Sequence, residues 1–298
     1  MSAEPYFPFP LTTDAAALGL RTRRVPTRFG DVVLRRRGRG RDAIVLLHGA
    51  AGAWTTWTPL LTAIDAPDVV LLDLPGWGDS PLPSPPTVEA LSAAVAEALE
   101  ASGVRTWRVV GHSLGGFVAL HLAATRPDAV RSAALVSATT LSVLDGIERP
   151  LRRFGTSGAF TALLQVMRVG ALLGAAAHPI ARGLARLGVL KVLMRPLFAH
   201  GGRIDRSAVD ALARDIRPRS FALAAAAVRR YPARTLWRGI RCPVVAVSGE
   251  RDLFVLEEDR RELGGIVPGS VHLTLPGAGH FAHVEQPATT ARLLGLGG

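Results

Sequence analysis

Short apolar runs alternate with helical stretches through the first half of the chain, and this alternation limits the folds open to it. Four strands are predicted, over residues 43–47, 69–72, 107–110 and 131–137. Three helices are predicted between them, over residues 54–64, 87–101 and 114–125. Continuous apolar runs of this length are typical of parallel strands buried on both faces. Strands that alternate with such helices predict a parallel α/β sheet with right-handed crossovers.

The alternation stops near residue 140 and resumes about a hundred residues later. Residues 141–240 are rich in Ala, Leu and Arg, and their Gly and Pro residues divide them into short predicted helices. Two more strands and a closing helix are predicted beyond them, over residues 243–247, 271–275 and 284–294. We therefore predict an α/β core formed by residues 1–140 and 241–298, interrupted by a helical cap over residues 141–240.

Composition excludes several classes of protein. Hydrophobic residues make up 48% of the 298 residues, which excludes an intrinsically disordered chain. The single cysteine, Cys242, excludes a disulfide framework and any multi-cysteine metal site. The N-terminus has no basic segment followed by an apolar run, so no signal peptide is expected and the cytoplasm is the expected compartment. The most apolar stretch, residues 159–177, contains Gln165 and Arg168, and it predicts a helix inside the protein rather than a membrane span.

The positive charge is concentrated in one part of the chain. The net charge is +11, and residues 140–240 hold 17 basic and 5 acidic residues, a balance of +12. A smaller basic run near the start comprises Arg35, Arg36, Arg37, Arg39 and Arg41. Because no nucleic-acid-binding motif accompanies these residues, solvated arginines are favoured over a binding patch and no nucleic-acid partner is expected. Contact with an anionic membrane surface is left open but not favoured.

The sequence Gly-His-Ser-Leu-Gly-Gly, over residues 111–116, lies between a predicted strand and a predicted helix. This arrangement around G-x-S-x-G is typical of a nucleophile elbow, a sharp turn that exposes its serine. Ser113 is therefore the candidate nucleophile, and the helix that starts at Leu114 directs its amides at developing negative charge. The alternative is a glycine-rich turn that holds a serine with no chemical role.

A serine hydroxyl needs a base to accept its proton, and the base needs an acid to orient it. His280 follows the last predicted strand, which places it at the same sheet edge as the serine, and His283 is the alternative. Asp252 follows the preceding strand and is the candidate acid, with Glu250 as the alternative. The order Ser113, Asp252, His280 is the chain order of this triad in α/β hydrolases.

The loop after the first predicted strand is the candidate second half of an oxyanion hole. Its sequence, over residues 48–52, contains small residues that let the backbone approach a substrate. We assign the backbone amides of Ala50 and Leu114 as the two donors. His48 is expected to hold the loop through hydrogen bonds rather than to act chemically.

Five segments together resemble the α/β-hydrolase superfamily, and specifically its capped serine hydrolases with a helical lid. They are LLHGAAGAW, LDLPGWGDS, VVGHSLGG, RCPVVAVSGERD and LPGAGHFAHVEQP. The resemblance implies an eight-stranded, mostly parallel sheet with helices on both faces and a cap inserted after the sixth strand. A serine at position 113, where epoxide hydrolases and haloalkane dehalogenases of this fold have Asp, argues against those two activities.

These features predict a serine hydrolase that cleaves a carboxylic ester, lactone or thioester through an acyl-enzyme. Ser113 attacks, His280 transfers the proton, and Asp252 orients His280. The expected partner is a small ester or acyl compound, no metal or organic cofactor is expected, and the chain is a monomer or homodimer. Two alternatives stay open: a carbon–carbon bond hydrolase of the same fold, and a ligand receptor with negligible turnover.

Overall fold

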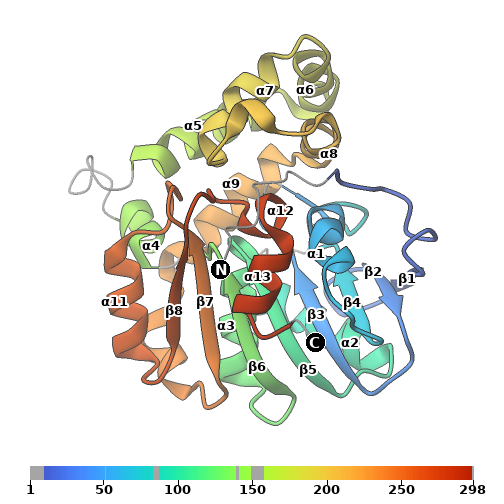
Figure 1. Ribbon diagram of the computed structural model, residues 1–298, viewed down its shortest axis with the longest axis vertical. Helices are drawn as coiled ribbons and strands as arrows, with labels where there is room; N and C mark the ends of the chain where they lie inside the picture. The colour runs from blue at the N-terminus through green and yellow to red at the C-terminus, as the bar shows by residue number, and fades with distance from the viewer. Residues whose placement is uncertain (1–9, 51, 83–86, 139–140, 149–157, 297–298) are drawn as a thin grey trace.

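An eight-stranded sheet crosses the centre of the molecule in the computed structural model of the chain (Figure 1). The structure describes residues 10–50, 52–82, 87–138, 141–148 and 158–296, without the side chains of residues 146–148 and 230. The N-terminal segment examined for a signal peptide and the predicted boundary at residue 140 lie outside the described residues. The strands are β1 (Arg21–Val25), β2 (Val32–Arg37), β3 (Asp42–Leu47), β4 (Val69–Leu72), β5 (Thr106–His112), β6 (Val130–Val136), β7 (Val244–Gly249) and β8 (Val271–Leu275).

The strand order is β1-β2-β4-β3-β5-β6-β7-β8, and the last six strands in this order run parallel. β2 pairs antiparallel with both β1 and β4, so the sheet is mostly parallel, as expected. The apolar runs predicted β3 to β8. β1 and β2 were not located individually, because their sequences, RTRRV and VVLRRR, contain too many arginines to form an apolar run.

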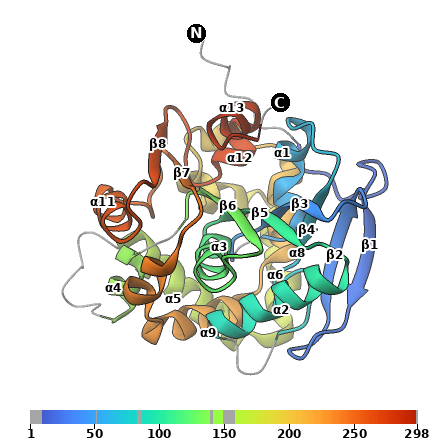
Figure 2. The same ribbon diagram turned by 90° about the horizontal axis from the view of Figure 1, so that it is seen from below.

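Helices cover both faces of the sheet (Figure 2). One face carries α1 (Thr58–Thr62), α12 (Ala282–Glu285) and α13 (Pro287–Leu293), and the other carries α2 (Val88–Ala101), α3 (Leu114–Thr125) and α11 (Glu257–Ile266). The predicted N-cap of α2 is present, since the Thr87 hydroxyl accepts a hydrogen bond of 3.1 Å from the Ala90 amide. Each face thus has its own apolar core, one packed around Trp107 and Phe117 and the other around Trp57 and Leu60.

The single closing helix predicted over residues 284–294 is wrong, because two short helices, α12 and α13, occupy this region. The break lies at Gln286, whose backbone angles of −141° and 67° are not helical. Pro287 explains it, since a proline ring disfavours the helical conformation of the preceding residue. The Gln286 side chain donates a hydrogen bond to the Pro276 carbonyl, which ties the break to the loop after β8.

The cap helices lie between β6 and β7 in the sequence. They are α4 (Leu141–Glu148), α5 (Gly158–Leu172), α6 (Ala177–Arg186), α7 (Val189–Met194), α8 (Arg206–Asp215), α9 (Pro218–Ala227) and α10 (Ala233–Leu236). α5 to α8 sit above the carboxyl edge of the sheet (Figure 1). Ala224, Tyr231 and Trp237, near the end of this region, pack into the same apolar cluster as α3. The cap therefore covers the edge at which parallel strands of this sheet end, and its last helices anchor it to the core.

The apolar stretch over residues 159–177 is not one helix, because α5 ends at Leu172 and a 3₁₀ turn follows at Gly174–Ala176, and its expected position inside the protein holds for only one face of α5. Within α5, Leu164 and Met167 are buried, whereas Val166, Val169 and Leu172 are exposed, the last of them by 87%. An apolar sequence does not distinguish a buried helix from one with an unpartnered face. In the described part of the chain no single helix is long and apolar enough to cross a membrane. α5 and α6 have the necessary length and composition only as a pair, which is bent by 118°.

Arg35 departs from the expectation of solvated arginines. Its side chain is buried and its guanidinium lies 2.6 Å from a carboxylate oxygen of Asp73 and 2.7 Å from one of Asp79. The same group stacks over the Trp54 ring at 4.7 Å. Asp73 also accepts hydrogen bonds from the amides of Trp54 and Asp79, so its carboxylate holds together two loops at the carboxyl edge of the sheet.

We expect Asp73→Asn to lower the free energy of unfolding by about 3–5 kcal/mol, because it leaves the buried Arg35 charge without its fully buried counterion. Urea unfolding followed by circular dichroism measures the change. The matched control is Asp31→Asn, which removes the carboxylate of an exposed pair with Arg24, 3.6 Å long, and is expected to change stability by less than about 1 kcal/mol. Equal losses in the two variants contradict the prediction.

Candidate active site

Ser113 occupies the sharp turn between β5 and α3, as the sequence predicted. Its backbone angles are 51° and −117°, a conformation that a residue with a side chain rarely adopts. The turn is tight, since a Cβ atom on Gly111 would lie 2.3 Å from the Gly115 carbonyl oxygen, and one on Gly115 would lie 2.1 Å from that of Leu47. Strain of this kind persists where the surroundings enforce it and is common at functional sites.

His280 and Asp252 meet at the same edge of the sheet. The Nδ1 atom of His280 lies 3.0 Å from Oδ1 and 3.1 Å from Oδ2 of Asp252, and both side chains are buried. Burial favours a raised pKa for Asp252, but the charge and hydrogen bond of His280 and the amide of Phe254 outweigh it, and the pKa is lowered. The carboxylate is therefore ionised and accepts the Nδ1 proton, which leaves Nε2 of His280 free to accept another.

The loop that carries His280 is hydrogen-bonded to the cap. The His280 amide donates to the Leu197 carbonyl over 2.8 Å. The buried carboxylate of Glu285 accepts the Gly279 amide on one oxygen and the Ala199 amide on the other, at 2.9 and 2.8 Å. Gly279 has no room for a side chain, because a Cβ atom there would lie 2.7 Å from the Leu197 carbonyl oxygen. Glu285 was not a candidate from the sequence, and its only signal is a carboxylate within an otherwise apolar closing segment.

The two alternatives considered for the acid and the base lie elsewhere. Glu250 is exposed and accepts a hydrogen bond from the Gly277 amide, whereas Asp252 contacts the imidazole. His283 is fully buried against Trp57, with ring centroids 4.4 Å apart, and it is absent from the residues that line the cavity beside Ser113. The structure thus joins Asp252 to His280, whereas Glu250 is bonded to a different partner and His283 is buried outside the cavity wall.

Ala50 and Leu114 line the same cavity as Ser113. Leu114 is the first residue of α3, so its amide has no acceptor in a preceding helical turn. The Ala50 carbonyl accepts a hydrogen bond of 2.6 Å from the Trp77 indole, which fixes the loop. His48 holds the same loop, as expected, because its Nε2 accepts the Leu74 amide at 2.9 Å. Two backbone amides of this kind suit the binding of an oxyanion.

A cavity of about 550 Å³ lies between the core and the cap, with Ser113 and His280 in its wall. The rest of its lining is mainly apolar, and α5 and α9 supply Phe160, Leu163 and Phe221. A volume of this size accommodates a small organic ligand. Within the described residues, the Ser113 hydroxyl makes no hydrogen bond, and such bonds often form only when substrate binds.

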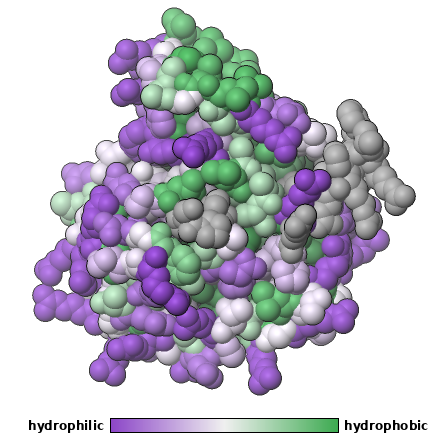
Figure 3. Space-filling view, turned by 180° about the vertical axis from the view of Figure 1, so that it is seen from behind, coloured by the Kyte–Doolittle hydropathy of each residue, from purple (hydrophilic) through white to green (hydrophobic). Residues whose placement is uncertain are grey.

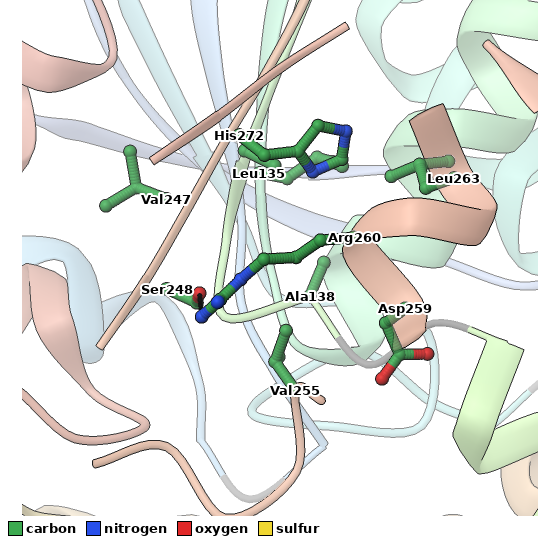
Figure 4. Close-up of a pocket in the computed structure, with 10 residues that line it drawn as sticks. Leu135, Ala138, Val247, Ser248, Val255, Asp259, Arg260, Leu263 and His272 are labelled. Carbon is green, nitrogen blue, oxygen red and sulfur yellow. Dashed lines mark hydrogen bonds between the residues drawn. The ribbon is translucent and has the colours of Figure 1, made fainter. Parts of the chain in front are cut away.

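A second, much smaller cavity of about 20 Å³ lies between α11 and the end of the sheet (Figure 4). The Arg260 side chain crosses it and donates a hydrogen bond of 2.8 Å to the Ser248 hydroxyl. The neighbouring Asp259 accepts bonds from the amide and hydroxyl of Ser142, which ties the first cap helix to α11. This space holds about one water molecule, so it is a structural site rather than a substrate pocket.

Two buried histidines behind His280 make stability depend on pH. Burial, reinforced by the nearby His280, lowers the pKa of His283 to about 3, and burial together with the adjacent histidines lowers that of His112 well below its usual value. Below pH 6.5 the unfolded chain therefore binds protons that the folded chain does not. The contribution of these histidines to the free energy of unfolding is present in full above that pH. It falls as the pH decreases, by about 1.4 kcal/mol per pH unit for each histidine.

Urea unfolding at pH 7 and pH 5 measures this effect, and His283→Phe is expected to remove the share of the decrease that belongs to His283. Phe suits the site because neither His283 ring nitrogen has a partner among the described residues. An unchanged pH dependence in the variant contradicts the assignment.

Comparison with known proteins identifies the family. The chain matches the family described as the alpha/beta hydrolase fold over residues 42–287. The chain belongs to the α/β hydrolase family. The resemblance in the five sequence segments is therefore confirmed, and so is the predicted fold class.

Other members of the α/β hydrolase family are similar along most of this chain. A pimeloyl-[acyl-carrier protein] methyl ester esterase from Chromobacterium violaceum is 32% identical over 271 residues, covering 86% of this chain and 94% of the esterase. A protein from Enterobacter cloacae, named as a proposed carbamate hydrolase, is 29% identical and covers 86% of this chain and 90% of its own. The crystal structure of an enol-lactonase from Burkholderia xenovorans shares the fold, with a TM-score of 0.71, 21% identity, and coverage of 92% of this chain and 99% of the lactonase. The protein is thus a hydrolase of the α/β hydrolase family.

Proposed function

We propose that this α/β hydrolase cleaves a carboxylic ester, or a related lactone or thioester, through an acyl-enzyme formed on Ser113. One observation carries the proposal: the strained Ser113 shares a cavity with His280, whose imidazole is bonded to the buried carboxylate of Asp252. A nucleophile, a base with a free nitrogen and an orienting acid are the three parts that acyl transfer requires.

Each residue then has one role. The Nε2 atom of His280 accepts the Ser113 proton as the hydroxyl oxygen attacks the ester carbonyl, and Asp252 stabilises the imidazolium that forms. The amides of Ala50 and Leu114 bind the oxyanion of the tetrahedral intermediate. His280 next donates its proton to the leaving alcohol. Water, deprotonated by His280, attacks the acyl-enzyme, and His280 returns this proton to the Ser113 oxygen as the acid is released.

The cavity indicates the kind of substrate. Its apolar lining from the cap favours a hydrophobic acyl or alcohol group, since each buried methylene contributes about 0.8 kcal/mol. The methyl ester esterase activity in the name of one relative agrees with an ester substrate.

Labelling with a fluorophosphonate probe tests the nucleophile first. The native protein is expected to label, and Ser113→Ala is expected not to. Absence of labelling in the native protein favours the ligand receptor. A panel of nitrophenyl esters from acetate to octanoate, lactones and vinylogous diketones then tests the substrate. If only the diketones are turned over, carbon–carbon bond cleavage replaces ester hydrolysis as the proposed function.

A further inference from the structure

The outer surface of the cap exposes an unusual number of large apolar side chains. Within the described residues, nine of the eleven exposed large hydrophobic side chains lie between positions 166 and 193. Leu172 and Leu187 are exposed by 87% and 78%, and Val169, Val189 and Val192 join them. None of these five lines the cavity. Figure 3 shows hydrophobic residues gathered at the top of the molecule, where the cap lies. Exposed patches of this kind mark interaction sites.

All the charged side chains of this part of the cap are basic. Residues 158–203, which span α5 to α7 and the turns that follow, contain six basic residues and no Asp or Glu. Four of them, Arg168, Arg182, Arg186 and Arg195, are exposed and form no ion pair with any other described residue. Hydrophilic residues border the apolar cluster in Figure 3. Apolar side chains beside unpaired arginines match the surface of a bilayer that contains anionic lipids.

The apolar surface is continuous with the lining of the cavity. Val166, Leu173, Ile180 and Leu193 are exposed and also line the cavity that holds Ser113. These four residues form a rim between the outer surface of the cap and the cavity. An acyl chain in a bilayer beneath this rim can enter the cavity while remaining among apolar side chains.

The lengths of the helices favour a position along the bilayer surface. α5 has 15 residues, or about 22 Å of helix, whereas a hydrocarbon core is about 30 Å thick. α6, which follows after a break, turns away from α5 by 118°. Two short helices at this angle suit a position along the interface better than a crossing of the hydrocarbon core.

We propose that the outer face of α5, α6 and α7, called the cap face, docks on a bilayer that contains anionic lipids. Its arginines contact the headgroups, and Leu172, Leu187 and their apolar neighbours enter the acyl boundary. A second copy of the chain is the competing occupant. Two cap faces packed against each other bring the exposed arginines of both copies together with no acidic residue in residues 158–203 of either copy, which opposes such a dimer.

Vesicle sedimentation tests the docking on the full-length Ser113→Ala variant, so the result does not depend on turnover. The vesicles are phosphatidylcholine alone and an equal mixture of phosphatidylcholine and phosphatidylglycerol. Binding is expected to the mixed vesicles, and it is expected to weaken as salt rises from 0.01 to 0.1 M, when the Debye length falls from about 30 to about 10 Å. Because this experiment measures binding and not turnover, the protein is expected to bind vesicles even if it does not hydrolyse esters. A failure of the docking proposal is therefore distinguishable from a failure of the proposed function.

Two double variants measure separately how much the arginines and the apolar side chains of the cap face contribute to vesicle binding. Arg182→Gln/Arg186→Gln is expected to weaken binding to mixed vesicles about 25-fold. Leu172→Ser/Leu187→Ser is expected to weaken it by at least about tenfold. The matched controls are Arg238→Gln/Arg241→Gln and Val271→Ser. They change exposed residues of the same kinds outside the cap face, and they are expected to leave binding within about twofold of the parent.

Three results overturn the proposal. The first is absence of binding to mixed vesicles, and the second is an equal loss in the cap-face variants and their controls. The third is a dimer in sedimentation velocity that Leu172→Ser/Leu187→Ser converts to monomer, because the cap face is then the contact between two copies.

Discussion

We expect Ser113→Ala to lower ester turnover by roughly 10⁶-fold and to leave the fold intact. The substitution removes the hydroxyl oxygen proposed to form the acyl-enzyme, and the amides of Ala50 and Leu114 alone are expected to provide only the residual catalysis of an oxyanion hole. Alanine keeps the Cβ atom of serine, so the strained turn at a φ of 51° is under the same steric constraint in the variant. The measurement is kcat for a nitrophenyl ester, with circular dichroism and thermal unfolding as checks of the fold.

The matched control for Ser113→Ala is Ser92→Ala. Ser92 is a buried serine of α2, and its hydroxyl has no partner among the described residues, so its removal is expected to leave kcat unchanged. Retention of more than a few per cent of native activity by Ser113→Ala excludes Ser113 as the nucleophile. The catalytic serine then has to be sought at another position.

We expect Asp252→Asn to lower kcat by roughly 10⁴-fold, because it favours the wrong tautomer of His280. The buried carboxylate accepts the Nδ1 proton, at 3.0 Å, and an amide in its place donates to Nδ1 and moves the imidazole proton to Nε2. Nε2 can then no longer accept the Ser113 proton. Steady-state kinetics with a nitrophenyl ester measure the loss, and fluorophosphonate labelling is expected to slow in parallel.

Glu250→Gln is the control for the acid. Glu250 lies two residues away, is exposed, and contacts the Gly277 amide, so its substitution is expected to change kcat by less than about threefold. A ranking in which Glu250→Gln has the larger effect transfers the role of the acid to Glu250.

The core was predictable because its signals are local. A buried parallel strand is a continuous apolar run, and the functional loops follow the ends of such strands, so the juxtaposition of Asp252 with His280 follows from their positions after β7 and β8. The edge strand β1 lacks this signal because four of its five residues are exposed. The break at Gln286 was missed because the apolar spacing continues across Pro287.

The cap was less predictable, because its geometry depends on contacts between distant segments. Its helices are recognisable from spacing, but an Ala- and Leu-rich helix can pack in many ways, and nothing in the sequence of α5 shows that Leu172 is left exposed. The role of Glu285 likewise emerges only when the Gly279 and Ala199 amides, 80 residues apart, converge on one carboxylate.

The hydrogen bonds of the 197–199 segment limit how this enzyme can be re-engineered. Two of them, from His280 to Leu197 and from Ala199 to Glu285, join a piece of the cap to the core, and Glu285 also accepts the Gly279 amide of the loop that carries the candidate base. A chimaera that receives the whole cap of another hydrolase therefore also changes the support of its general base, and altered specificity comes with altered rate. Grafts that keep residues 195–200 and exchange only α5 to α7 separate the two properties.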